Sequence, residues 1–225
     1  MTGPPTTLEL GPPRRSHVSC TLGAHQTPTS SIDYFLPPND RYFALLDPAA
    51  CTGCGGNLIN LIKAHISLDF RTRCRQPVTI QIVGAKGTPE CPVPDPDHVV
   101  CPSQVFELEP TATGVFEFAL SLPTDCCITE RAFLCMTIDG FGADCNDAST
   151  RPMLPYAGAG PCAPCRVYNF YDDPNGHHED DMCLLFPHGS AFPGPPVLYT
   201  EADCCTLVPV LPSTWGSLKI RYRSP

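Results

Sequence analysis

Charged residues are scarce in this sequence, and basic ones are scarcer than acidic ones. Asp, Glu, Lys and Arg make up 16% of the 225 residues, and the formal net charge is −9 at pH 7. A protein that binds nucleic acid through its phosphates needs clustered Lys and Arg. Lys219, Arg221 and Arg223 form a small basic cluster, but their spacing fits the solvent face of a terminal strand. The composition therefore predicts no nucleic-acid partner.

Long hydrophobic runs are also missing. No apolar stretch approaches the roughly 20 residues that a membrane-spanning helix needs, so we expect no membrane span. The first 20 residues lack the apolar segment of a secretory signal. If the protein is exported, its signal has been removed, its natural start lies elsewhere, or it leaves the cell by another route.

Cysteine, proline and glycine are abundant instead. The chain has 15 cysteines, 28 prolines and 17 glycines. Many prolines and glycines predict frequent turns between short strands, and cysteines spread along the whole sequence are typical of a disulfide framework. We therefore expect a protein of an oxidising compartment, extracellular or on the cell surface.

Alternating apolar and polar residues predict an all-β fold. From Ile62 to Phe70 every second residue is apolar, which places one face in a core and the other in water. The same pattern, or a shorter version of it, marks residues 78–82, 105–108, 116–122, 132–138, 167–171, 182–186, 197–200 and 218–222. Such strands with Gly and Pro between them favour an antiparallel β-sandwich with jelly-roll-like topology, fastened by disulfides.

Three regions follow from this pattern. Residues 1–38 contain three Pro-Pro pairs and no sustained periodicity, which indicates an extended Pro-rich arm with one strand-like fragment, Thr7–Leu10. Residues 39–206 are expected to form the sandwich body. Residues 207–225 are expected to form a C-terminal tail that ends in a strand.

The motif CTGCGG, from Cys51 to Gly56, admits three interpretations. As half of a zinc site it needs a second pair, which Cys162 and Cys165 can supply, but zinc ribbons usually take both pairs from a short span. As a redox dithiol it needs a βαβ context that the sequence lacks. We favour two disulfides that tie this turn to two other places, with the glycines bending the backbone.

The remaining cysteines follow the same reasoning. The disulfide candidates are Cys51, Cys54, Cys74, Cys91, Cys101, Cys126, Cys127, Cys145, Cys162, Cys165, Cys183, Cys204 and Cys205. Adjacent cysteines on a strand point to opposite faces, so each is expected to bond elsewhere. We predict a bridge between Cys91 and Cys101, which bracket a Pro-rich loop. The odd count leaves one thiol unpaired, either Cys20 as an intermolecular link or with its partner lost, or Cys135 as a buried apolar residue.

One polar segment has the composition of a metal site. Residues 171–181 read YDDPNGHHEDD; such oxygen-rich side chains can bind Ca²⁺, and the two histidines can bind a transition metal. The candidate ligands are Asp172, Asp173, Asn175, His177, His178, Asp180 and Asp181. The spacing matches neither an EF-hand nor HExxH. A solvated turn between strands is the interpretation that we favour, so we expect no cofactor.

The C-terminal region carries a resemblance to a known group of proteins. Its features are CRVYNFY at 165–171, FPGPPVLY at 192–199, DCC at 203–205 and WGSLKIRYR at 215–223. Together they resemble uncharacterised secreted bacterial Cys-rich β-sandwich proteins that end in a W-G-x-x-K-x-x-Y-R motif. The resemblance implies export and a sandwich fold, and the group has no established activity from which one could be expected here.

These features predict a non-catalytic secreted subunit with a structural or adhesive role. It is expected to self-associate through its arm or to bind extracellular matrix or surface components. A carbohydrate-binding module is the alternative, with Tyr168, Tyr199 and Trp215 as exposed rings for stacking on a glycan. A metal-dependent hydrolase that uses residues 172–181 is the third possibility.

Overall fold

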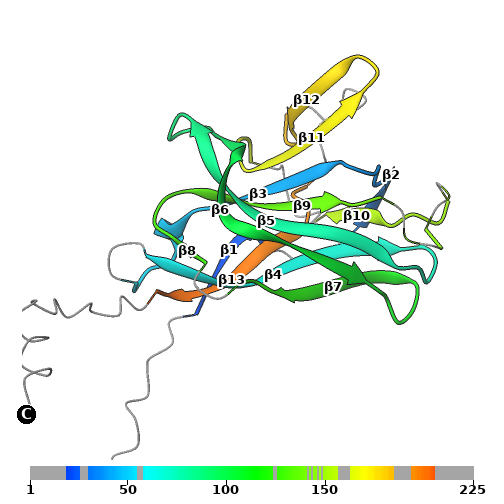
Figure 1. Cartoon of the computed structure of the whole chain (residues 1–225), viewed down its shortest axis with the longest axis horizontal. Coiled ribbons are helices and arrows are strands. Elements are labelled where there is room, and N and C mark those ends of the chain that lie inside the picture. The colour runs from blue at the N-terminus through cyan, green and yellow to red at the C-terminus, as the bar shows by residue number, and fades with distance from the viewer. Residues whose placement is uncertain are drawn as a thin grey trace, which may run out of the picture.

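Two antiparallel β-sheets make up the described part of the protein (Figure 1). The computed structural model describes residues 19–25, 30–54, 58–123, 126–140, 142, 144–145, 147, 149–156, 163–184 and 194–205. Buried side chains of both sheets form one continuous core cluster. The expected all-β sandwich fastened by disulfides is therefore confirmed.

The first sheet, called sheet A, is built around one long strand. Its strands are β1 (Cys20–Ala24), β2 (Ser30–Phe35), β4 (Ile59–Phe70), β7 (Gly114–Ser121), β8 (Cys127–Ile128), β10 (Met153–Tyr156) and β13 (Leu198–Cys204). Ile66 of β4 lies opposite Leu198 of β13 on one side and opposite Phe118 of β7 on the other. The order β1-β13-β4-β10-β2 leaves β1 as an edge strand beside β13.

The second sheet, called sheet B, has the order β12-β11-β3-β9-β5-β6. Its strands are β3 (Arg41–Leu46), β5 (Gln76–Gly87), β6 (Pro92–Leu108), β9 (Ala132–Ile138), β11 (Val167–Asp173) and β12 (Gly176–Asp181). The prolines of β6 fit this position because an edge strand has one side without ladder hydrogen bonds, where no backbone N–H is needed. A second apolar cluster, which includes Phe43, Phe133 and Phe170, lies on these strands.

The apolar half of the alternation predicted for residues 62–70 holds in β4 from Ala64 onward, but the expectation that the other face lies in water is wrong for His65 and Ser67, which are 6% and 1% exposed. Ala64, Ile66, Leu68 and Phe70 are fully buried, whereas Ile62 is 39% exposed. The register between β4 and β13 shifts between Glu201 and Ala202. Such a β-bulge adds one residue to a strand and reverses the alternation beyond it, so the expectation for Ile62 is wrong.

The predicted boundary of the N-terminal arm at residue 38 is also wrong. β1 and β2 lie within residues 1–38 and belong to sheet A. Leu22 of β1 is buried in the common core. These strands are too short to show periodicity, and β1 pairs with β13 from the far end of the chain. Thr7–Leu10 and residues 207–225 lie outside the described residues.

Six disulfides link described cysteines of the strands and of the loops between them. They are Cys20–Cys51, Cys54–Cys204, Cys74–Cys145, Cys91–Cys165, Cys101–Cys126 and Cys127–Cys205. Cys183 is also disulfide-bonded, and Cys162 lies outside the described residues. The adjacent cysteines each bond elsewhere, as the strand geometry predicts. Because Cys51, Cys54 and Cys165 are all bonded to other cysteines, the zinc interpretation of CTGCGG is wrong.

Two cysteine predictions need correction. The predicted Cys91–Cys101 bridge is wrong because residues 92–108 are one strand rather than a loop. An extended strand advances roughly 3.3 Å per residue, which carries Cys101 far from Cys91. The expectation of an unpaired Cys20 is wrong because Cys20 bonds Cys51.

Among the described cysteines, the free one is Cys135, which is buried in β9. Burial raises the pKa of its thiol to about 12. A thiol with such a pKa is almost entirely protonated at neutral pH, and the thiolate is the reactive form. Cys135 is therefore an inert apolar residue of the core, which was the second of the two possibilities considered for the unpaired thiol.

Candidate functional site

The polar segment predicted as a solvated turn is largely a β-hairpin. β11 and β12 pair from Tyr168 opposite Asp181 to Asp173 opposite Gly176. Asp173 Oδ1 accepts hydrogen bonds from the backbone N–H groups of Asn175 (2.7 Å) and Gly176 (3.1 Å). Aspartate, proline, asparagine and glycine are the residues that favour tight turns. The strand predicted at 182–186 is wrong in its described part, because residues 182–184 form a turn after β12.

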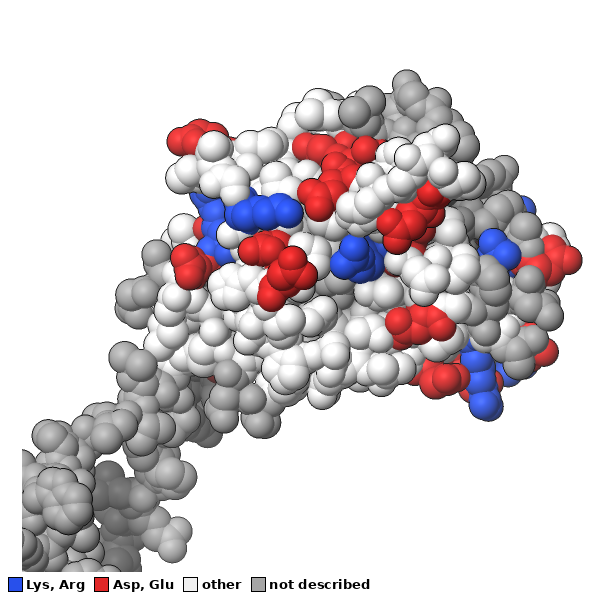
Figure 2. All heavy atoms as spheres, turned by 45° about the horizontal axis from the view of Figure 1, so that its top comes forward, with Lys and Arg blue, Asp and Glu red and all other residues white. Residues whose placement is uncertain are grey.

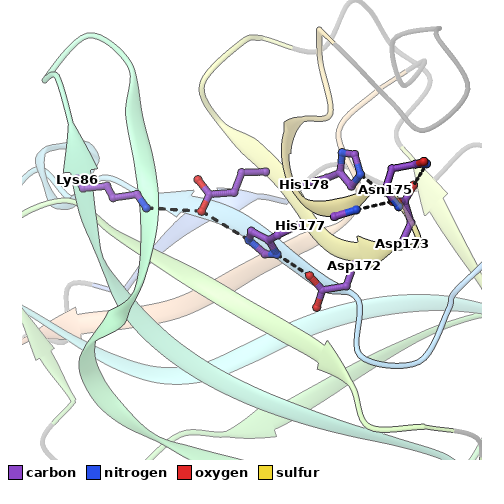
Figure 3. Close-up of polar contacts among 8 residues, drawn as sticks. Lys86, Asp172, Asp173, Asn175, His177 and His178 are labelled. Atoms are coloured by element: carbon purple, nitrogen blue, oxygen red, sulfur yellow. Dashed lines mark hydrogen bonds and ion pairs between the residues drawn. The ribbon is translucent and has the colours of Figure 1, made fainter.

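The hairpin divides the candidate metal ligands between two faces. Neighbouring residues of a strand point to opposite faces, so His177 and His178 lie on different sides. His177 Nδ1 is 2.8 Å from Asp172 Oδ1, and His178 Nε2 is 3.0 Å from Asp173 Oδ1 (Figure 3). Asp181 projects to the His177 side and Asp180 to the His178 side, by the register of the hairpin. Within the part of the chain that the structure describes, no group of three or more His, Cys, Asp or Glu side chains can hold a metal ion.

A chain of ion pairs connects the hairpin to the end of β5. Lys86 Nζ lies 3.6 Å from Glu179 Oε1, which lies 3.7 Å from His177 Nε2. Figure 3 shows the Lys86 side chain directed toward the hairpin from the end of β5. On the face seen in Figure 2, acidic side chains are mixed with a few basic ones. Asp172, Asp173 and Glu179 therefore have histidine or lysine partners, whereas Asp180 accepts from the Tyr171 hydroxyl and Asp181 from backbone N–H groups.

Sheet A carries a second polar cluster that sequence reasoning missed. His65 of β4 has both ring nitrogens at carboxylate oxygens, Nδ1 at 3.1 Å from Glu117 Oε1 and Nε2 at 2.9 Å from Glu201 Oε1. Its ring stacks on Tyr199 with centroids 4.5 Å apart. The Tyr199 hydroxyl donates to Glu117 Oε1 at 3.0 Å. The period-two pattern placed His65 on the outer face of the strand, but it did not reveal which distant strands supply its partners.

Three tyrosines in or near these two clusters have raised pKa values. Burial, together with neighbouring carboxylates, raises the pKa of Tyr199, Tyr171 and Tyr168 to about 12 in each case. For Tyr199, Glu117 adds to this effect because it accepts the phenolic hydrogen bond and repels the phenolate. The neutral phenols are therefore favoured in the folded protein.

We expect the folded protein to lose stability as the pH rises from 10 to 12. In the unfolded chain tyrosine ionises near pH 10, so over this range the unfolded state binds fewer protons than the folded state, and the free energy of unfolding falls. Urea denaturation at several alkaline pH values measures this fall.

Tyrosinate absorbance should also show that Glu117→Gln lowers the Tyr199 pKa, whereas Glu107→Gln on the exposed part of β6 leaves it unchanged. Equal titration curves for the two variants would contradict the assignment.

The two described sugar-stacking candidates, Tyr168 and Tyr199, lie on different sheets. Tyr168 is 4% exposed, and its hydroxyl donates to the carbonyl of Pro92 at 2.9 Å. A ring held inside the core cannot stack on a glycan, so the expectation for Tyr168 is wrong. Tyr199 is on the outer face of sheet A, where His65 covers one side of its ring. Trp215 lies outside the described residues.

A polar cleft of about 410 Å³ opens beside β6 and β8. Its lining includes His98, Cys127, Thr129, Glu130 and Arg131. The His98 imidazole lies directly over Gly84, and a Cβ at this position would force that ring to move. Arg131 is already engaged by Asp47, with Nε 3.0 Å from Oδ2. The cleft therefore has a small polar surface, and its arginine, Arg131, is already paired with a carboxylate.

The disulfides place the two ends of the body next to each other. β1 begins at Cys20 and pairs antiparallel with β13, which ends at Cys204 (Figure 1). Cys20 bonds Cys51, and Cys54 bonds Cys204. We call this unit of Cys20, residues 51–54 and Cys204 the terminal clamp. It fixes both ends of the body to the same turn.

Most of the body matches a known protein family. Residues 23–202 match the model of a domain of unknown function, DUF7451. The matched segment runs from within β1 to within β13 and so spans both sheets. No curated protein and no solved structure matches the chain. In the described residues, no helix is long and apolar enough to cross a membrane. The W-G-x-x-K-x-x-Y-R resemblance lies beyond the matched segment and stays a prediction.

Proposed function

The chain belongs to the DUF7451 family, and we propose that this member is a non-catalytic structural or adhesive subunit that works outside the cell. The terminal clamp is the observation that carries this proposal. It joins the beginning and the end of the body through two disulfides and one four-residue turn. A body fastened in this way can act as a rigid block that connects whatever is attached before Cys20 with whatever is attached after Cys204.

The disulfide framework supports an oxidising location. Structural disulfides persist outside the cell and are rare in reducing compartments. Cys51, Cys54, Cys74, Cys101, Cys126 and Cys145 are all buried. Burial keeps their bonds away from attacking thiolates. The framework therefore suits a protein that stays outside the cell for a long time.

The polar clusters support a non-catalytic role. The ring nitrogens of His65, His177 and His178 lie near carboxylates of adjacent strands. Such cross-strand pairs stabilise the sheets that contain them. We therefore assign these histidines to the scaffold rather than to substrate chemistry.

We further propose that the N-terminal segment mediates self-association. The sequence Thr7-Leu8-Glu9-Leu10 can add as a strand to an exposed sheet edge of another copy. Such addition needs backbone N–H groups, and proline has none. The proposal is therefore sensitive to a single proline in this fragment.

Removing residues 1–18 is expected to leave a folded monomer that no longer assembles. β1 begins at Cys20, so the truncation spares every described strand. Leu8→Pro should have the same effect, whereas Thr2→Pro, outside the fragment, should assemble normally. Analytical ultracentrifugation and electron microscopy measure assembly, and a thermal melt checks the fold. Unchanged assembly of the truncated or Leu8→Pro protein would refute self-association through this segment.

Carbohydrate binding is tested in the same preparation with a glycan array. Saturable binding that Tyr199→Ala abolishes would favour a carbohydrate-binding module over the structural role. Tyr156→Ala, at a partly buried tyrosine of β10, is the matched control. We expect no saturable binding by any of these proteins.

A further inference from the structure

We propose that the protein is a force-bearing link in which tension between its two terminal segments bypasses the folded body. The inference rests on the proposed structural role and adds a mechanical function to it. It follows from the order of covalent bonds in the terminal clamp. A pull applied before Cys20 and after Cys204 meets these bonds first.

The covalent path through the clamp is very short. It runs from Cys20 across a disulfide to Cys51, along Thr52 and Gly53 to Cys54, and across a second disulfide to Cys204. The Cα atoms of the two bridged pairs are 5.7 and 5.2 Å apart. Residues 21–50 and 55–203 are therefore side loops of this path. They contain nearly all of both sheets, and they carry no load while the two disulfides are intact.

Without these bonds the body would be loaded in its weakest direction. Cys20 lies opposite Ala202, and Ala24 lies opposite Leu198. Tension applied to the adjacent ends of this antiparallel pair would open its backbone hydrogen bonds one after another. β1 has five residues and is an edge strand, and each hydrogen bond contributes only about 1 kcal/mol net. The strand would peel from the sheet at low force.

The turn between the two disulfides is built to stay in place. Asp47 caps the short 3-10 helix Pro48–Ala50 by accepting from the Ala49 N–H at 3.1 Å. The Cys51 N–H donates to the carbonyl of Pro48 at 3.0 Å. Gly53 has φ +114°, a conformation that glycine adopts without strain. The path therefore crosses a fixed turn rather than a slack loop.

A second route is available beside the clamp. Cys205 bonds Cys127, so load at the C-terminal end also reaches β8. This route returns to Cys51 only through longer stretches of chain, by way of Cys145–Cys74. This longer route bears no load while the clamp is intact. Its length sets how much chain is released when the Cys54–Cys204 bond is removed.

Single-molecule force spectroscopy on the whole chain, with handles on its two terminal segments, tests the proposal. The oxidised protein should show no unfolding step. Full reduction should release the chain from Cys20 to Cys204, roughly 600–660 Å at about 3.3–3.6 Å per residue. Cys20→Ala with Cys51→Ala should release only the stretch up to Cys54, roughly 110–120 Å. In the variant with Cys54→Ala and Cys204→Ala, the load should pass along the chain from Cys51 to Cys74, across the disulfide to Cys145, along the chain to Cys127, and across the disulfide to Cys205. The two stretches of chain should release roughly 135–150 Å.

The matched control removes a disulfide that is not on the path. Cys74→Ala with Cys145→Ala should destabilise the fold without producing a release step. A release of several hundred ångströms from the oxidised wild-type protein would overturn the proposal, as would a release step in the control. The measurement uses single molecules, so its outcome is independent of the assembly experiment, and either proposal can fail alone.

Discussion

Replacing both Cys54 and Cys204 with alanine is expected to lower the free energy of unfolding by about 4 kcal/mol. The two residues are separated by 150 positions, but the remaining disulfides shorten the loop that their bond closes. The shortest remaining connection runs through Cys74–Cys145 and Cys127–Cys205. A loop of roughly 40 residues still gives this magnitude in the chain-entropy model.

Urea denaturation of the oxidised variant and wild type measures this difference. Alanine is preferred to serine because Cys54 is buried, and a buried hydroxyl without a partner has its own cost. Cys135→Ala is the matched control, since it removes one buried sulfur and no cross-link. It is expected to cost roughly 1 kcal/mol, as for the loss of a small buried group. A loss for the double variant no larger than that of the control would contradict the role given to this disulfide.

Phe70→Ala should cost about 3–5 kcal/mol of stability. Phe70 ends β4 and is fully buried in the core between the sheets. Its ring meets those of Phe116 and Phe118 with centroids 6.4 and 6.0 Å away. Removing the ring leaves a cavity that the strands around it cannot close. Both the transfer energy of the ring and the cavity contribute to the loss.

Val105→Ala is the control for this core substitution. Val105 is 69% exposed on edge strand β6, so its change should stay within about 0.5 kcal/mol. The midpoints of urea or thermal unfolding give both values. If Phe70→Ala cost no more than Val105→Ala, the two-sheet core described above would be wrong.

The body strands could be predicted from the sequence because each of their patterns is local. In β4 the alternation from Ala64 to Phe70 directly reflects a face turned toward the core. β9 and β11 were also predicted as strands, although most of their residues are buried on both faces. The Asp173-Pro174-Asn175-Gly176 turn was also visible, because each of its residues favours a tight turn.

Features that depend on distant partners could not be predicted. β1 reads as part of a Pro-rich arm until β13 is placed beside it. The first part of β6, up to Cys101, reads as a loop because its prolines suggest one, whereas residues 105–108 were predicted as a strand; the edge position of β6 explains why the prolines are tolerated. The cluster around His65 needs Glu117 and Glu201 from two other strands. Cysteine pairing has the same difficulty, since many connectivities fit one set of cysteines.

The central claim is that two disulfides join both ends of the body to the turn at residues 51–54. Peptide mapping of the native protein under non-reducing conditions tests this most directly. The account predicts that Cys20 is recovered linked to Cys51 and Cys54 linked to Cys204. Recovery of Cys20 as a free thiol, or of Cys54 linked to any other cysteine, would contradict it.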